Sequence, residues 1–285
     1  MISLPAKVSP HPETHNFSEK TNIKPCLSNS DSCSLTPNSC ANSTQLNRTP
    51  KVMVLIPCYQ EEEHIGFVAG SCISLGYDTL VVDDGSKDET SAVARATGAR
   101  VLQHEINRGK GHAVRAGLQH ALDLEYDAVV IIDGDGQHLP NEISRFIDAF
   151  ALTHTDLIIG TRMANTQNMP FIRRQTNRLM SWLLSRQIGH RLSDTQCGFR
   201  LISSKAIPIA IQCTSIGFSA ESEILLHLAL AGYRISEIPV STIYGDEESK
   251  IRPVRDTLRF VKMLIHFRQQ RLKLKRKNKL QSTQP

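Results

Sequence analysis

From residue 51 onward, short apolar runs alternate with segments in which apolar residues recur every three or four positions. The runs predict buried strands, and the wider spacing predicts helices packed on a sheet. The predicted strands are 52–56, 79–82, 100–103, 128–132, 156–159, 195–202 and 235–244, the last an edge strand interrupted at Pro239. The predicted helices are 61–74, 88–97, 112–124, 141–152, 174–188 and 220–231. This alternation is typical of an α/β fold, in which a parallel sheet has helices on both faces and binds ligands at the carboxyl ends of its strands.

Two flanking segments depart from this pattern. Residues 1–50 contain 26 Ser, Thr, Asn or Pro residues, so they bury too little apolar surface to offset the entropy of ordering the chain. Residues 254–279 have a helical pattern with a wide apolar face beside a basic stripe. The sequence therefore predicts a disordered extension over 1–50, an α/β domain over 51–252, and a basic amphipathic helix with a tail over 253–285.

Charge and cysteine usage exclude several classes of protein. The 285-residue chain has a net charge of +5, but nine Lys or Arg and no acid lie from Arg259 to the C-terminus, so the preceding 258 residues carry −4. A slightly acidic body with a basic tail does not favour a nucleic-acid-binding protein. We find no signal-peptide pattern and no apolar run near the roughly 18 residues of a membrane span. The seven cysteines include no C-x-x-C pair, which predicts reduced cytosolic thiols.

Acidic residues follow three of the predicted strands. They lie in the segments Ile56–Glu62, Val82–Asp88 and Ile132–His138. Because the carboxyl ends of neighbouring parallel strands meet at one edge of a sheet, these acids are expected in one crevice. Burying them there would be unfavourable without a cation or hydrogen-bond donors. Three acidic segments in one crevice are better explained by a binding site than by three unrelated polar turns.

The third acidic segment is the candidate metal site. Asp133 and Asp135 follow the most apolar strand and are separated by Gly134, which lets the backbone bend around an ion. Two carboxylates at this spacing can hold a hard divalent cation, and Gln137 could add a further oxygen.

Cationic side chains are expected near these acids. Lys110 lies in the glycine-containing segment Asn107–Gly111, Arg200 ends the segment 194–200, and Lys250 lies near the end of the domain. A metal ion together with such cations suits a diphosphate leaving group. The Walker A motif is absent, and no G-x-G-x-x-G motif follows the first strand, which excludes a P-loop and a Rossmann dinucleotide site.

Seven motifs resemble those of family 2 glycosyltransferases of the GT-A fold, and most closely the dolichyl-phosphate and polyprenyl-phosphate mannosyl- and glucosyltransferases. They are Ile56–Glu61 (IPCYQE), Val82–Ser86 (VDDGS), Asn107–Gly111 (NRGKG), Asp133–His138 (DGDGQH), Gly160–Arg162 (GTR), Asp194–Arg200 (DTQCGFR) and Ser249–Lys250 (SK). The resemblance covers residues 51–258. It implies a single GT-A catalytic domain with a Rossmann-like, mostly parallel sheet flanked by helices.

The chain departs from the family pattern in a few places. Gln60 stands where the family usually has Asn, and Gly134 where it usually has another small residue. Many relatives carry C-terminal membrane helices, whereas this chain resembles the members that dock on the membrane or on partner subunits.

The resemblance also implies roles for individual residues. The implied contacts to the nucleotide sugar come from Pro57, Tyr59, Glu61, Asp84, Lys110, Asp133, Gly134, Asp135, Arg200 and Lys250. The implied catalytic residues are Asp135 and Arg200. The implied ligands of Mg²⁺ or Mn²⁺ are Asp133, Asp135 and Gln137. The implied contacts to the acceptor phosphate are Arg162, Arg173 and Asn177.

The implied activity is inverting transfer of a hexose from a nucleotide sugar, of the GDP-mannose or UDP-glucose type, to a polyprenyl or dolichyl phosphate on the cytoplasmic membrane face. A lipid phosphate is already an anion at pH 7 and needs no strong base, so the metal and Arg side chains would act chiefly on the leaving nucleoside diphosphate. A hydroxyl acceptor, as in polysaccharide or glycolipid synthesis, would need a general base. Glu221 and Glu223 are the candidates for that base, and polar positions on an amphipathic helix explain them equally well.

Two further function classes fit the residues less well. A sugar nucleotidyltransferase needs a glycine-rich loop after the first strand, which the segment from Pro57 lacks. An inactive sugar-nucleotide-binding adaptor would not need intact Asp133, Asp135 and Arg200. Residues 254–279 allow two interpretations, a C-terminal helix packed on the core with a solvated tail, or a surface helix on anionic lipid. Under the second, we expect a cytoplasmic protein held peripherally on an anionic membrane surface by the tail from Arg259. A membrane partner subunit is a further candidate for this contact.

Overall fold

The computed structural model describes residues 48–163, 169–215 and 219–243, together with residues 260, 264, 265 and 267. Its strands are β1 (Val52–Cys58), β2 (Asp78–Asp83), β3 (Arg100–Gln103), β4 (Ala128–Ile131), β5 (Leu157–Thr161), β6 (Arg200–Ser203) and β7 (Ile235–Pro239). Its helices are α1 (Ile65–Ser74), α2 (Thr90–Ala96), α3 (Lys110–Asp123), the 3₁₀ helix η1 (Pro140–Glu142), α4 (Ile143–Thr153), α5 (Phe171–Ile188), α6 (Ile207–Ala210) and α7 (Ser219–Leu230).

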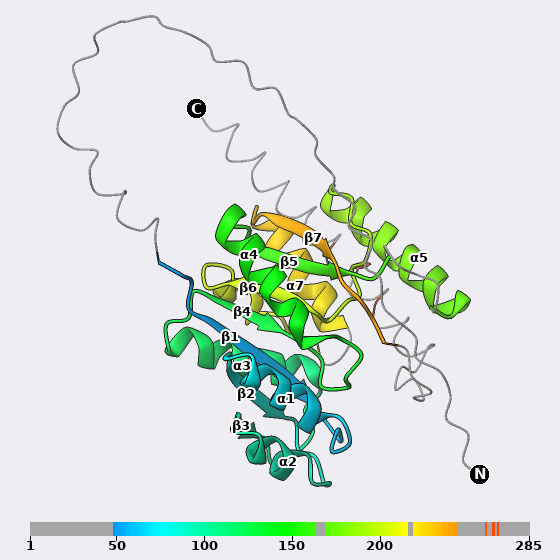
Figure 1. The fold of residues 1–285 in the computed structure, drawn as a ribbon. Coiled ribbons are helices and arrows are strands. Elements are labelled where there is room, and N and C mark those ends of the chain that lie inside the picture. The colour runs from blue at the N-terminus through cyan, green and yellow to red at the C-terminus, as the bar shows by residue number, and fades with distance from the viewer. Residues whose placement is uncertain are drawn as a thin grey trace, which may run out of the picture. The chain divides into compact units, whose positions relative to one another are not determined.

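One seven-stranded sheet, in the order β3-β2-β1-β4-β6-β5-β7, organises these elements (Figure 1). Neighbouring strands are parallel except around β6, which runs antiparallel to both β4 and β5. In the register, Leu55 of β1 lies opposite Leu80 of β2 on one side and Ile131 of β4 on the other. The carboxyl ends of β2, β1 and β4 are therefore adjacent, with β1 in the middle.

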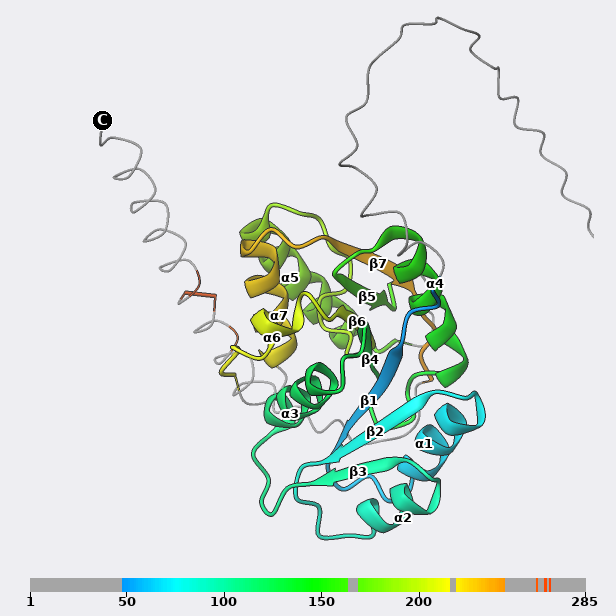
Figure 2. The same cartoon turned by 90° about the vertical axis from the view of Figure 1, so that its left-hand side faces the viewer.

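Helices cover both faces of the sheet, which explains why its central strands are apolar on both sides. Figure 2 shows α3, α5, α6 and α7 on one side of the sheet and α1 and α4 on the other. Helix α3 packs on β1 and contacts α6 and α7, while α1 packs on β1 and β2 and contacts α2. Gly117 allows the close approach of α3, because a Cβ there would overlap the side chain of Leu55.

The α/β fold predicted from the sequence is confirmed, with particular differences. The antiparallel direction of β6 was not predicted, nor was the short helix α6. The strand expected over 195–202 begins only at Arg200. The preceding residues form a turn whose amides bond to side chains, such as Gln196 N to Asp194 Oδ1 (3.2 Å). The last strand lies at the sheet edge, as expected.

Several predictions concern residues outside those that the structure describes. They are the disordered extension over 1–50 apart from its last three residues, nearly all of the basic helix and tail over 253–285, and the phosphate contact of Lys250. The domain boundaries therefore stay predictions. Among the described residues, no helix combines the length and the apolar character needed to cross a bilayer.

Candidate active site

The carboxyl ends of β2, β1 and β4 form one continuous edge. Backbone hydrogen bonds extend past the strands: Asp84 N donates to Cys58 O (2.9 Å), and Ile132 N donates to Leu55 O (3.0 Å). Pro57 pairs with Val82 in the register between β1 and β2. The three acidic segments therefore begin side by side, as the sequence predicted.

A lysine links two carboxylates at this edge. Lys110, the first residue of α3, places its Nζ 2.6 Å from Asp133 Oδ1 and 2.6 Å from Glu221 Oε1 of α7. Burial alone would lower the pKa of Lys110, but the two carboxylate charges outweigh burial and raise it. Burial alone would raise the pKa of Asp133, but the charge and hydrogen bond of Lys110, together with the charges of other groups such as Arg162, outweigh burial and lower the pKa. Lys110 and Asp133 are thus both held ionised, and Glu221 forms the second ion pair of the lysine.

Asp135 has a different electrostatic environment from Asp133. Burial, followed by the negative charge of Asp133, raises the pKa of Asp135 to about 6. The backbone N–H of Gln137 donates to Asp135 Oδ1 (3.0 Å), and the Gln137 carbonyl accepts from Ile243 N (2.9 Å). The turn is fixed by these bonds, and it leaves two carboxylates close enough to repel each other.

Two glycines allow the chain to pass close to this pair of carboxylates. A Cβ on Gly198 would lie 2.8 Å from Cγ of Asp133 and would overlap its Oδ2. A Cβ on Gly134 would lie 3.1 Å from Cβ of Cys58. Gly198 therefore sets how far the Asp133 carboxylate can extend, a role that the sequence analysis did not assign to it.

Asp84 fastens the loop that precedes α3. Its carboxylate accepts hydrogen bonds from the backbone N–H of Arg108 (3.1 Å) and of Gly109 (2.5 Å), and its Oδ1 lies 2.8 Å from His104 Nδ1. Because Lys110 follows directly, Asp84 positions the lysine that bridges the two carboxylates. The predicted contact of Asp84 with a nucleotide base stays a prediction.

The segment after β1 carries the other predicted nucleotide contacts. Pro57 is buried and Tyr59 is half-buried. Glu61 is anchored through its backbone, because its N–H donates to Thr90 Oγ1 (2.9 Å), while its carboxylate lies 3.6 Å from His64 Nδ1. These residues belong to the first acidic segment, which begins next to the other two, and their contact with the nucleotide stays a prediction.

Arg200 is almost fully buried, with 2% exposure. Its guanidinium donates to three backbone carbonyls, those of Thr195 (2.8 Å), Cys197 (2.6 Å) and Glu221 (2.8 Å). Burial lowers the pKa of Arg200 from its usual value. The bonds tie the turn before β6 to α7, next to the carboxylate that holds Lys110. Its predicted contact with phosphate stays a prediction.

A second buried ion pair lies at the end of β5. Arg162 donates from Nε to Asp194 Oδ2 (2.7 Å) and from Nη2 to Asp194 Oδ1 (2.9 Å). Burial opposes ionisation of Asp194, but the hydrogen bonds and charge of Arg162 outweigh it and lower the pKa of this carboxyl. Glu237 of β7 accepts from the backbone N–H of Asp194 (3.0 Å). Arg162, predicted to meet the acceptor phosphate, is therefore held in one orientation.

Helix α5 is fastened next to this pair and carries the other predicted acceptor residues. Thr195 N donates to Ser181 Oγ of α5 (2.9 Å). Asn177 lies one turn earlier and is buried, and its Nδ2 has no hydrogen-bond partner among the described residues. Arg173 lies one further turn earlier and is half-buried. Their contact with an acceptor phosphate stays a prediction.

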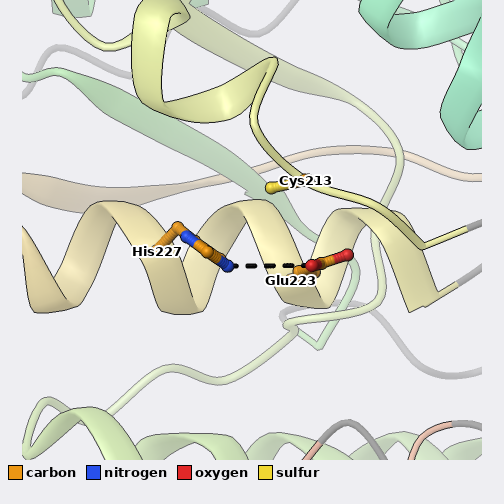
Figure 3. A group of neighbouring side chains, drawn as sticks. All are labelled: Cys213, Glu223 and His227. Carbon is orange, nitrogen blue, oxygen red and sulfur yellow. Dashed lines mark ion pairs between the residues drawn. The ribbon is translucent and has the colours of Figure 1, made fainter. Parts of the chain in front are cut away.

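A separate cluster on α7 concerns the candidate bases. Figure 3 shows Glu223 and His227 one turn apart on α7, near the thiol of Cys213, with a Glu223–His227 ion pair of 3.7 Å. The ligand atoms of the three residues lie within 4.8 Å of one another. However, Glu223 accepts from the backbone N–H of Ser215 (2.7 Å) and of Thr214 (3.2 Å). Although burial opposes it, these bonds and His227 lower the pKa of Glu223 to about 2, so its role is to fasten the loop before α7.

Sequence reasoning missed the contacts that hold the site together. Glu221, a candidate base, is the partner of Lys110, and Asp194 is the partner of Arg162. Both partnerships join residues far apart in the chain, and no local spacing could reveal them. The only available signal for Gly198 was its position in a motif that also contains Asp194 and Arg200.

Comparisons with known proteins relate this chain to glycosyltransferases. Residues 53–208 match the model of the family described as glycosyl transferase family 2. An uncharacterised protein of Methanocaldococcus jannaschii is 33% identical over 229 residues, which cover 76% of this chain and 98% of the relative. The UDP-N-acetylglucosamine–dolichyl-phosphate N-acetylglucosaminyltransferase of Methanococcus voltae is 29% identical, covering 68% of this chain and 86% of the relative. The undecaprenyl-phosphate mannosyltransferase of Micrococcus luteus is 30% identical, with 68% and 84% covered.

Solved structures match the fold. Glucosyl-3-phosphoglycerate synthase of Mycobacterium tuberculosis, in complex with phosphoglyceric acid, superposes with a TM-score of 0.59 at 20% identity, covering 76% of this chain and 80% of that one. This likeness supports the GT-A architecture. Together with the family match over more than half of the chain, it shows that the protein belongs to glycosyl transferase family 2 and is a glycosyltransferase of the GT-A fold.

Proposed function

We propose that this glycosyltransferase moves a hexose from a nucleotide sugar, of the GDP-mannose or UDP-glucose type, to a polyprenyl or dolichyl phosphate on the cytoplasmic face of a membrane. The proposal rests mainly on the position of Asp133 and Asp135, which we call the donor edge, at the same end of the sheet as the ion-paired Arg162. This follows from the register, in which Ile131 of β4 and Ile159 of β5 both lie opposite Arg200 of β6. Relatives from Methanococcus voltae and Micrococcus luteus are named for transfer to dolichyl phosphate and undecaprenyl phosphate. They differ in the sugar, so the sugar stays open.

The donor edge fits a divalent cation. Asp133 and Asp135 offer only oxygen ligands, and the mutual repulsion that contributes to the raised pKa of Asp135 is relieved by a cation. The related synthase from Mycobacterium tuberculosis has been crystallised with Mn²⁺ or Mg²⁺ and UDP. We therefore assign Asp133 and Asp135 as ligands of Mg²⁺ or Mn²⁺, with Gln137 as a further one. When bound, the ion would neutralise charge on the diphosphate.

The chain's own residues supply the rest of the donor site. Lys110 enters from α3 with its charge maintained by two carboxylates. A diphosphate that binds here offers Lys110 a further anion, and the Lys110 charge then stabilises the leaving nucleoside diphosphate. Asp84 contributes indirectly, since it orders the loop from which Lys110 projects.

The acceptor side favours a phosphate over a hydroxyl. A hydroxyl would need a general base, but Glu221 is ion-paired with Lys110, and Glu223 has its pKa lowered to about 2. A phosphate oxygen is anionic at pH 7 and can attack the anomeric carbon directly. The new bond joins that oxygen to the anomeric carbon, and the bond to the nucleoside diphosphate breaks, so its electron pair leaves with the diphosphate. Attack opposite the leaving group inverts the configuration.

The proposal is tested by incubating the protein with a panel of labelled nucleotide sugars, polyprenyl phosphate and Mn²⁺ or Mg²⁺, and extracting the product into organic solvent. We expect label in the organic phase with one donor, and its loss in excess EDTA or in Asp135→Asn. Asp135→Asn keeps the side-chain volume and removes one anionic ligand, so its fold should stay intact. Full activity of this variant, or full activity in EDTA, would contradict the metal assignment. Absence of transfer with every donor would contradict the function.

A further inference from the structure

Helix α5 exposes large apolar side chains to solvent. Phe171 is 64% exposed, Leu179 is 58% exposed and Trp182 is 58% exposed. Apolar side chains of this size are usually buried, and several of them on one helix indicate an interaction surface. The opposite side of α5 is an ordinary packing face, with Ser181 and Leu184 buried.

The exposed residues form one continuous face. At about 100° per residue, positions 171, 175, 178, 179, 182 and 186 fall within an arc of roughly 100°. All six are exposed. We name this surface the α5 docking face, and its residues are Phe171, Gln175, Arg178, Leu179, Trp182 and Arg186. It mixes three large apolar side chains with two arginines and has no acid.

The positive charge of helix α5 favours an anionic partner. Helix α5 contains Arg173, Arg174, Arg178 and Arg186 and no Asp or Glu, and the sequence has no acid anywhere between Asp156 and Asp194. Arg guanidinium groups pair well with phosphate oxygens. A tryptophan beside leucine, phenylalanine and arginine on one helical face is the pattern of a helix that lies in a membrane interface.

We propose that the α5 docking face binds the surface of an anionic phospholipid bilayer, with Phe171, Leu179 and Trp182 inserted at the level of the headgroups. The inference rests on the proposed function, since a polyprenyl phosphate stays in the bilayer and the enzyme must reach it there. It also links membrane binding to the acceptor, because the predicted acceptor contacts Arg173 and Asn177 lie on the same helix. Arg173 and Asn177 lie on the opposite side of α5 from the docking face, so docking holds them one helix diameter, about 10 Å, from the membrane surface. This contact is distinct from the one predicted for the tail after Arg259.

Trp182 provides a direct probe, because it is the only tryptophan in the chain. The full-length protein is titrated with vesicles of phosphatidylcholine alone and of phosphatidylcholine mixed with phosphatidylglycerol. We expect a blue shift of Trp182 emission, and quenching by bromine-labelled lipid chains, with the anionic vesicles. If the protein sediments with these vesicles while Trp182 emission stays unshifted and unquenched, another surface makes the contact and the proposal is overturned.

Substitutions on the α5 docking face, with a control substitution on α4, test the proposal further. Leu179→Glu should weaken vesicle binding about tenfold or more, because it removes an apolar anchor and adds a negative charge. Arg178→Gln combined with Arg186→Gln should weaken it about 25-fold at low salt, at about fivefold per charge. Leu152→Glu on α4, where the leucine is 84% exposed, is the control and should bind as the wild type does. Equal binding by Leu179→Glu and Leu152→Glu would overturn the proposal.

A soluble acceptor separates this proposal from the proposed function. Leu179→Glu should transfer sugar normally to a short, water-soluble isoprenyl phosphate and poorly to polyprenyl phosphate in vesicles. Unchanged transfer to the vesicle acceptor would overturn docking by α5 and leave the function standing. A Trp182 shift with vesicles, but no transfer to either acceptor by the wild type, would support docking and contradict the function.

Discussion

Gly198→Ala tests whether the position of the Asp133 carboxylate governs activity. The added methyl would lie 2.8 Å from Asp133 Cγ and closer still to Oδ2. Carbon atoms in ordinary contact lie at least about 3.5 Å apart, so the carboxylate must retreat by roughly 0.7–1 Å. It cannot retreat freely, because Lys110 holds its Oδ1 at 2.6 Å. A displacement of about 1 Å at a reacting centre lowers the rate about 100-fold.

We therefore expect Gly198→Ala to lower kcat/KM about 100-fold and to raise the Mn²⁺ concentration needed for half-maximal activity. The stability cost of overpacking should be about 1–3 kcal/mol, so circular dichroism and the melting temperature must show a folded variant at the assay temperature. The rise in melting temperature on adding Mn²⁺ should also shrink, which is a readout independent of turnover.

Gly70→Ala is the matched control for the same chemical change. Its Cβ would lie 3.7 Å from Thr97 Cγ2, an ordinary contact. Gly70 lies inside α1, and an added Cβ would contact only Thr97 and none of the acidic segments. Alanine should stabilise this helix by about 0.5–1 kcal/mol and leave kcat/KM unchanged. A folded Gly198→Ala variant with wild-type kcat/KM and a wild-type Mn²⁺ response would show that the position of the Asp133 carboxylate does not govern activity.

Three further substitutions test the electrostatics and the backbone. Lys110→Ala should lower the free energy of unfolding by about 2–3 kcal/mol, because it leaves Asp133 and Glu221 partly buried without their cation. Thermal melts should show that Mn²⁺ recovers part of this loss, and no recovery would contradict cation binding at Asp133. Glu223→Gln should cost about 2–3 kcal/mol at pH 7, because the pKa of Glu223 lies near 2 when folded against 4.5 in an ordinary glutamate. That stability is present above pH 4.5 and is lost as the pH falls towards 2, so denaturant titrations of wild type and variant should converge in acid, and a constant difference would refute the assignment. Gln60→Asn should raise the free energy of unfolding by about 0.5 kcal/mol in the same titration. Gln60 has φ +53, and asparagine tolerates this left-handed backbone region better than glutamine does. A loss of stability would argue against backbone strain at that position.

The order of elements could be predicted because each leaves a local pattern. The apolar runs of β1 and β4 and the helical spacing of α3 follow from burial on both faces of the sheet. The acids after β1, β2 and β4 could be placed at one edge of the sheet, because neighbouring parallel strands have their carboxyl ends at the same edge. Strand direction has no comparable local signature, and the antiparallel β6 was missed accordingly.

The candidate site could be predicted only in part. Spacing pointed to Asp133 and Asp135 as candidate metal ligands, because two carboxylates in one turn form a local motif, and that assignment stays a prediction. It did not show that Lys110 is held by Glu221, or that Arg162 is fixed by Asp194, because these partners meet only after the chain folds. The predicted use of Glu221 and Glu223 as bases was open in the sequence, and the hydrogen bonds and ion pairs of the folded chain argue against it.

The proposed mechanism requires that the nucleophile is a lipid phosphate rather than a hydroxyl. The most direct measurement is mass spectrometry of the organic-phase product made from a nucleotide sugar and polyprenyl phosphate, with and without mild acid treatment. We expect a hexose joined to the lipid through a single phosphate, in a glycosyl phosphodiester that mild acid cleaves to release the sugar. Absence of transfer to polyprenyl phosphate, together with an acid-stable glycoside on the hydroxyl of a diacylglycerol supplied in the same assay, would contradict this expectation.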